Sequence, residues 1–182
     1  MEVNQLKKVL IIFSIFLIYF FIYFLQVNFF NWFTISGIQP NLFILLALFI
    51  GIFMNGKMGA ILGFLLGLYT DFLFSNTIGI SGILLGAIGF CGEILDKKFS
   101  KNSKITIVLM GSIVTAIYEI FLYIYNILKL SINVDIISFI YILAIEIIYN
   151  AFIIIIFYPL IHRFGMYAES VFKNKKMLPR YF

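Results

Sequence analysis

Four acidic side chains are the groups in this strongly apolar sequence that are most able to do chemistry. They are Asp71, Glu93, Glu119 and Glu146, each within or at the end of a long apolar segment. No Lys or Arg lies in the interior of these segments to pair with them. A carboxyl group at the centre of a bilayer costs at least about 2.5 kcal/mol. Each acid must therefore be buried, hydrogen-bonded or neutral, or reach the membrane surface, as Asp71 and Glu93 could do.

Polar side chains accompany the two deeper acids, because steps of three and four residues return to one helix face. They are Tyr123 and Asn126 beside Glu119, and Tyr149 and Asn150 beside Glu146. We expect these carboxyl, phenol and amide groups to satisfy one another in a polar seam between the fifth and sixth apolar segments. The pattern leaves open whether the seam is structural or functional.

One short motif suggests an enzyme. The run G-I-S-G at 79–82 matches the G-x-S-G motif of rhomboid-type intramembrane serine proteases. Such a serine needs a base within hydrogen-bond reach. Ser81 and the single histidine, His162, are expected at opposite membrane surfaces, about 30 Å of hydrocarbon apart. The motif therefore does not predict a serine protease.

Other kinds of catalysis lack their residues. Asp71 is the single aspartate available within the spans, so an aspartyl intramembrane protease has no second carboxylate. One His and one Cys cannot form a typical zinc site. No glycine loop of a nucleotide-binding protein occurs either. We expect no enzymatic activity, no cofactor and no metal.

Composition indicates the elements that must position these residues. The sequence is 63% apolar and 12% charged, with a mean hydropathy of +1.10, whereas about a quarter of a soluble domain is charged. Six apolar segments are long enough, or nearly so, to cross a membrane as helices. They are residues 9–30, 40–54, 58–74, 78–95, 105–128 and 136–161. The sequence predicts an all-α integral membrane protein, a compact bundle of six transmembrane helices. The second segment is short, and residues 35–38 would lengthen it to a full crossing.

The basic residues orient this bundle, since Lys and Arg accumulate on the cytoplasmic side of membrane proteins. With a cytoplasmic N-terminus, 12 of the 13 basic residues fall inside and Lys129 alone falls outside. The net charge of +5 therefore reflects topology and does not indicate nucleic-acid binding. We expect both termini in the cytoplasm, one transmembrane domain over residues 1–163, and a basic amphipathic tail over residues 164–182 at the membrane lipids.

Small residues repeat at helical spacing in the third and fourth segments. The third carries Gly59, Gly63 and Gly67, and the fourth carries Gly79, Gly82, Gly86 and Gly89. Asp71 and Glu93 continue the two series at the next step. Glycine lets helix backbones approach closely in lipid. We expect these residues to form a packing face, either between the two segments or toward a partner helix.

The same elements carry a family resemblance. In order they are P-N-L at 40–42, the glycine series that ends in G-L-Y-T-D at 67–71, Gly79, E-I-I-Y-N at 146–150 and Y-P-L at 158–160. Along most of its length the sequence resembles MreD, the rod shape-determining membrane protein of bacteria. The resemblance implies a scaffold or regulator without a reaction of its own, in the bacterial cytoplasmic membrane. It also implies partners, namely an MreC-like protein and, with it, a RodA-type glycosyltransferase and a class B penicillin-binding protein of cell-wall synthesis.

A second family is similar in size and plan. The S components of energy-coupling-factor vitamin transporters also have six spans and glycine-rich helices, and MreD is thought to share their fold. Those proteins often dock their transport partner through small residues in the first span. Here residues 9–27 contain no Ala or Gly, and the outer loops look short for a vitamin lid. The transporter is therefore the alternative interpretation.

Overall fold

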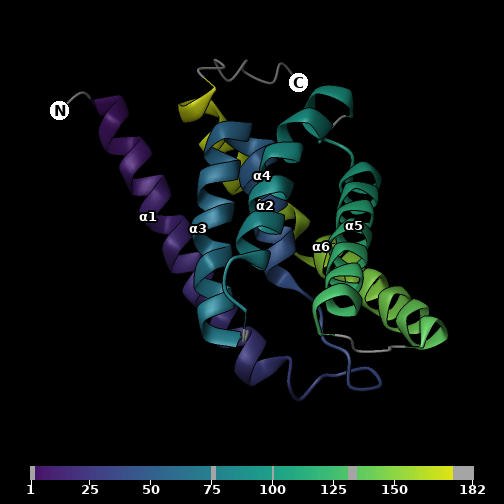
Figure 1. Cartoon of the computed structure of the whole chain (residues 1–182). Helices are drawn as coiled ribbons and strands as arrows, with labels where there is room; N and C mark the ends of the chain where they lie inside the picture. The colour runs from purple at the N-terminus through teal and green to yellow at the C-terminus, as the bar shows by residue number, and fades with distance from the viewer. Residues whose placement is uncertain (1–2, 75–76, 100, 131–134, 174–182) are drawn as a thin grey trace.

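The computed structural model describes residues 3–74, 77–99, 101–130 and 135–173. This part of the chain is all-helical, as the sequence predicts. The elements are α1 (Val3–Phe24), the π-helix η1 (Leu25–Phe29), α2 (Leu42–Phe53), α3 (Gly56–Phe74), α4 (Ile80–Lys98), α5 (Lys104–Leu130) and α6 (Ile136–Phe172). They form a bundle in which α1 lies along one side and α5 and α6 lie together on the other (Figure 1).

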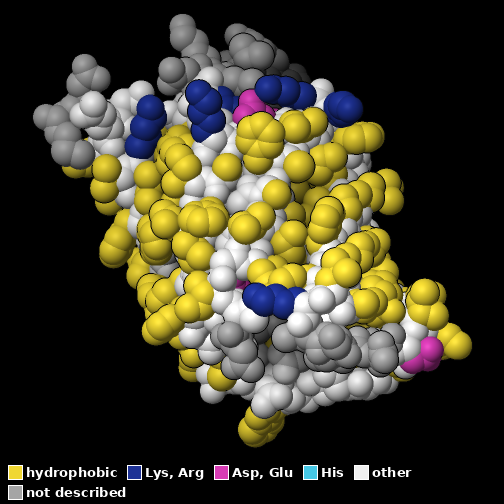
Figure 2. Space-filling model, in the orientation of Figure 1, with side chains coloured by type: hydrophobic (Ala, Val, Ile, Leu, Met, Phe, Trp, Pro, Cys, Tyr) yellow, Lys and Arg dark blue, Asp and Glu magenta, His cyan; other side chains and the backbone are white. Residues whose placement is uncertain are grey.

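Four of the described helices are long and apolar enough to cross a membrane. They are α1 with η1, α3, α5 and α6. Large apolar side chains on them face outward, for example Phe21, Phe121 and Phe152, each more than half exposed. Because lipid is the solvent that accommodates such a surface, the fold is that of a membrane helical bundle. Figure 2 shows apolar side chains covering the flank of the molecule between its two ends.

The second helix is the centre of the bundle. It has 12 residues and is about 18 Å long, too short to cross the hydrocarbon alone. Eleven of its residues are buried, including Ile44, Leu48 and Ile52 with no exposed surface. Neighbouring helices, and not lipid, therefore surround it on nearly all sides.

The predicted extension of this helix by residues 35–38 is wrong. Ile35 and Ile38 pair as an isolated antiparallel bridge around a tight turn. Ser36 and Gly37 have φ angles of 53° and 79°, in the left-handed region that ends helices. Asn41 has a non-helical backbone, with φ −105° and ψ 89°, so the helix begins at Leu42.

Both the start of α1 and the end of α6 lie at the same end of the bundle (Figure 1). Lys and Arg side chains gather along that end in Figure 2. The arrangement agrees with an even number of passes and with the charge pattern of the sequence. We name the basic end the inner end and the opposite end the outer end.

The last helix is longer than the sixth apolar segment. It runs unbroken over 37 residues, through the expected boundary between residues 163 and 164. Gly165, Ala168, Glu169 and Val171 are buried, because this part of α6 packs on the inner end of the bundle. Residues 164–173 are thus continuous with the helical bundle, and the rest of the expected tail lies outside the described residues.

Candidate functional site

The glycines of α3 and α4 lie against each other. A β-carbon on Gly59 would collide with the carbonyl group of Gly89, and one on Gly89 would collide with that of Gly59. Gly63 lies in the same way against the backbone of Leu85. In lipid, where apolar burial does not drive helices together, such close packing is what holds them. The third-segment glycine face is therefore filled from within the chain and is not open to a partner helix.

Of the other glycines in the predicted face, Gly67 and Gly86 also pack against the neighbouring helix, whereas Gly79 does not. Gly67 faces the backbone of Ser81 and Gly82, and Gly86 faces Ala60 and Phe64. Gly79 is an exception, because a β-carbon there would meet nothing within 4 Å and its φ is 112°. Its assignment to the packing face is a correction: Gly79 forms the left-handed turn before α4.

Two glycines that the sequence reasoning missed bring α2 into this contact. A β-carbon on Gly51 of α2 would collide with the carbonyl group of Gly89, and one on Gly92 would lie 2.8 Å from the carbonyl oxygen of Leu48. Gly92 falls three residues after Gly89, so the spacing of the α4 series could have revealed it.

Asp71 caps the first turn of α4. Its Oδ2 accepts hydrogen bonds from the backbone N–H groups of Gly79 at 2.8 Å, Ser81 at 3.0 Å and Gly82 at 3.4 Å. The side chain is 1% exposed. A helix N-terminus presents unpaired donors and partial positive charge, which a carboxylate satisfies. Asp71 therefore turns inward and does not reach the membrane surface as a free acid.

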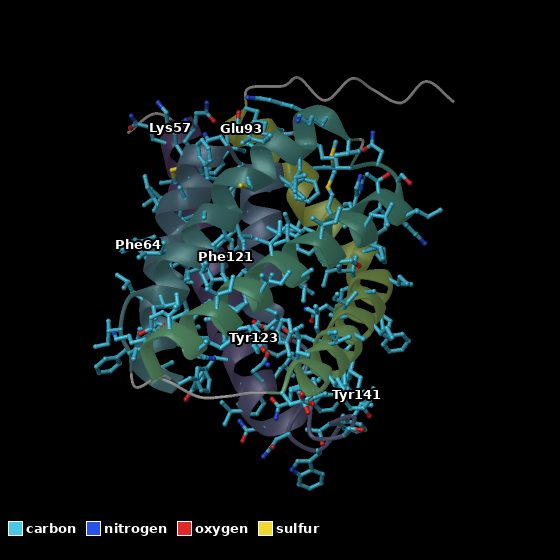
Figure 3. The ribbon with its side chains drawn as sticks, turned by 45° about the vertical axis from the view of Figure 1, so that its right-hand side comes forward. Lys57, Phe64, Glu93, Phe121, Tyr123 and Tyr141 are labelled. Atoms are coloured by element: carbon cyan, nitrogen blue, oxygen red, sulfur yellow. The ribbon has the colours of Figure 1, made fainter. Side chains whose placement is uncertain are left out.

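Glu93 performs the corresponding role at the inner end. Its Oε2 accepts the N–H of Gly56 at 2.5 Å, at the start of α3, and its Oε1 lies 2.8 Å from the ammonium group of Lys97. Figure 3 shows Glu93 near Lys57 at this end of the bundle. Each helix of the α3–α4 pair thus ends in an acid that caps the other.

The predicted polar seam exists in part. Glu119 of α5 and Glu146 of α6 line the same cavity, where these two helices face each other. Asn150 donates to the hydroxyl oxygen of Thr115 at 3.0 Å and accepts the backbone N–H of Asn41 at 2.9 Å. Thr115 and Asn150 have no exposed surface. The seam therefore extends from α5 and α6 to the start of α2.

The remaining seam residues have other neighbours. Tyr149 donates to the carbonyl oxygen of Phe33 in the segment before α2. Tyr123 stacks on Phe139, with ring centroids 4.1 Å apart. Asn126 is half-buried in the last turns of α5. Figure 3 places Tyr123 toward the outer end, on the side where α5 meets α6.

A cavity of about 540 Å³ opens at the outer end, beside the carboxyl pair. Its lining comes from η1, the segment 30–41, and α2 to α6. Polar lining residues include Gln26, Asn31, Gln39, Asn41, Thr70, Asp71, Ser81, Tyr118, Glu119 and Glu146. No Lys or Arg is among the described residues that line it. The segment 30–41 contributes four of the lining residues.

A buried ionic cluster at the inner end was not expected from the sequence. The ammonium group of Lys101 lies 2.8 Å from carboxylate oxygens of both Asp96 and Glu169, and Lys173 lies 2.7 Å from Asp96. The cluster ties the end of α4 to the end of α6. Burial raises the pKa of Asp96, which follows the fourth apolar segment, but hydrogen bonds from Lys101 and Lys173 outweigh this and hold the pKa below its usual value.

An apolar groove of about 330 Å³ lies between α1, α2 and α6. Ile18, Leu46 and Phe157 line it from the three helices. Ile11, Ile15 and Tyr19 are the buried residues of α1, so most of this helix stays open to neighbours. The groove is a concave surface of the kind to which a membrane-embedded chain can pack.

Comparison with known proteins identifies the bundle. Neither a curated protein nor a solved structure matches the chain significantly. The model of the family described as rod shape-determining protein MreD matches residues 4–168, from the first turn of α1 to near the end of α6. Because this match spans all six helices, the chain belongs to the MreD family of rod shape-determining membrane proteins.

Proposed function

We propose that this protein is a non-enzymatic scaffold of the cell-elongation complex in the bacterial cytoplasmic membrane. The observation that carries the proposal is the family match over residues 4–168 of a membrane helical bundle. The role is to hold an MreC-like partner and, with it, the RodA-type glycosyltransferase and class B penicillin-binding protein that build the lateral wall.

The groove between α1, α2 and α6 supports a contact with a membrane-spanning partner. Association of helices in lipid depends on close packing, so a concave face offers a partner helix more contacts than a convex one. The glycine contact supports the same role. It packs α2, which also lines the groove, tightly against α4. We assign the partner contact to this groove and not to the glycine face, which is internally filled.

Depletion tests the cellular role. In a rod-shaped bacterium that depends on this protein, depletion should turn cells round and disperse wall synthesis, and re-expression should restore rods. Cells that keep their shape would contradict the proposal, and loss of vitamin uptake in those cells would support the transporter alternative.

Cysteine cross-linking tests the partner contact. In a Cys91→Ser background, Phe157→Cys places a thiol in the groove, whereas Phe121→Cys places one on the outward face of α5. Cross-links to the MreC-like protein should form from position 157 and not from position 121. Equal yields, or cross-links from position 121 alone, would contradict the groove assignment.

A further inference from the structure

The outer cavity contains buried hydrogen-bond acceptors that no described residue satisfies. They are Oε1 of Gln26, Oδ1 of Asn41 and Oε1 of Glu146, and all three residues line the cavity. Glu146 is only 6% exposed. A buried acceptor without a donor costs about 1–3 kcal/mol, so three in one cavity need an explanation.

These three acceptors come from separate parts of the chain and converge. Gln26 is in η1, Asn41 precedes α2, and Glu146 is in α6. The Nε2 group of Gln26 donates to the carbonyl oxygen of Pro40, which leaves its Oε1 as the free end of the amide. Each of these three lining residues therefore has an oxygen acceptor for which the described residues supply no donor.

The ionisable side chains among the described lining residues are acidic, which suits a positively charged ligand. Asp71 is already satisfied by the first turn of α4, so the carboxyl pair of Glu119 and Glu146 is the remaining source of charge. These two carboxyl groups face the cavity without a Lys or Arg among its described lining residues. Such a site complements one positive charge that brings its own N–H donors.

Hydrogen bonds to α6 hold the segment 30–41 in place beside the cavity. Tyr149 donates to Phe33, Ser36 and Tyr141 are hydrogen-bonded at 2.9 Å, and the N–H of Asn41 is bound to Asn150. The cavity is also within the size range of ligand pockets, about 300–1,000 Å³. It is thus preformed by several bonds between α6 and the segment 30–41.

We propose that the outer cavity binds a primary ammonium group, with Glu146 as the main acceptor and Gln26 and Asn41 as additional acceptors. The ammonium group belongs to a small amine or to a lipid headgroup. This proposal is independent of the scaffold role, since it concerns the outer cavity and not the groove between α1, α2 and α6.

Ethanolamine is the probe, and choline is its matched control because its three N-methyl groups remove every N–H donor. The purified full-length protein in detergent is heated with either compound, and the midpoint of thermal unfolding is followed by size-exclusion chromatography. Ethanolamine should raise the midpoint in a saturable way, whereas choline, ethylene glycol and KCl should not. An equal rise with choline or KCl would overturn the proposal. The proposal would also fail if ethanolamine gave no rise in detergent and the midpoints in phosphatidylethanolamine and phosphatidylcholine nanodiscs were equal.

Variants locate the binding site. Glu146→Gln should weaken ethanolamine binding at least tenfold, and Gln26→Met provides a second test if the first variant does not fold. Asp135→Asn, an exposed acid at the outer end that does not line the cavity, is the control and should bind normally. Unchanged binding in both cavity variants would overturn the assignment.

Nanodiscs distinguish the two sources of the group. A higher midpoint in phosphatidylethanolamine than in phosphatidylcholine discs, lost in Glu146→Gln, supports the lipid headgroup. Equal midpoints in the two lipids, together with saturable stabilisation by free ethanolamine, support a small amine.

Discussion

Asp71 and Glu93 cap each other's helices at opposite ends of the α3–α4 pair. Asp71, near the end of α3, accepts backbone N–H groups at the start of α4, and Glu93, near the end of α4, accepts the N–H of Gly56 at the start of α3. Between these caps the glycines bring the two backbones into contact. The pair is therefore held together at both ends and along its length.

We expect Gly63→Leu to destabilise the protein by about 1–3 kcal/mol or more, because a side chain there would meet the backbone of Leu85, which cannot move aside as a side chain could. Folded protein recovered from membranes and its thermal midpoint in detergent measure the effect. Ala87→Leu, on the exposed face of α4, is the matched control and should be near normal. Normal recovery of Gly63→Leu would contradict the packing account.

Asp71→Ala should cost about 2 kcal/mol, since it leaves the first turn of α4 without its acceptor. Asp71→Asn should cost less, about 1 kcal/mol, because one acceptor oxygen remains while the charge is lost. Denaturant or thermal unfolding in detergent gives both values. Asp135→Asn serves as control, because Asp135 makes no side-chain cap bond. An equal loss in Asp135→Asn would show that capping is not the cause.

Lys101→Met should destabilise the protein by about 3–5 kcal/mol, because it leaves the carboxylates of Asp96 and Glu169 buried without this cation. Lys98→Met removes an exposed charge nearby and should change stability by no more than about 0.5 kcal/mol. The difference between their thermal midpoints measures the contribution of the cluster. Similar midpoints for the two variants would argue against it.

Stability should also fall at acid pH through Asp96. Its pKa in the folded protein lies below its ordinary value of 3.8, so its ionised form is favoured by folding. The resulting stabilisation is fully present above the unfolded pKa and is lost as the pH falls through the folded pKa. Thermal midpoints between about pH 6 and about pH 3 should therefore decline less steeply in Asp96→Asn, which starts from a lower stability. Parallel curves for the variant and the unmodified protein would exclude this contribution.

Local patterns determined much of the fold. Apolar runs predicted the helices, because a chain in lipid must satisfy its backbone within each span. The spacing of Gly59, Gly63 and Gly67 predicted a close-packing face, since periodicity along one helix is a property of the sequence itself. The charge distribution predicted that the two chain termini lie on the same side of the membrane. The start of α1 and the end of α6 lie at the same end of the bundle, where Lys and Arg side chains gather (Figures 1 and 2).

Only the tertiary structure decided which groups meet. Whether α2 crosses the membrane or lies buried at 12 residues depends on its neighbours, and whether Asp71 reaches water or caps α4 depends on how the chain turns at Gly79. The contact of Lys101 with Glu169 joins residues 68 positions apart, which no local period encodes. The outer cavity likewise needs η1, the segment 30–41 and α6 in one place. Such contacts depend on packing among segments that are distant in the chain. The sequence therefore identified the acidic residues, but the tertiary structure determined the contacts that each of them makes.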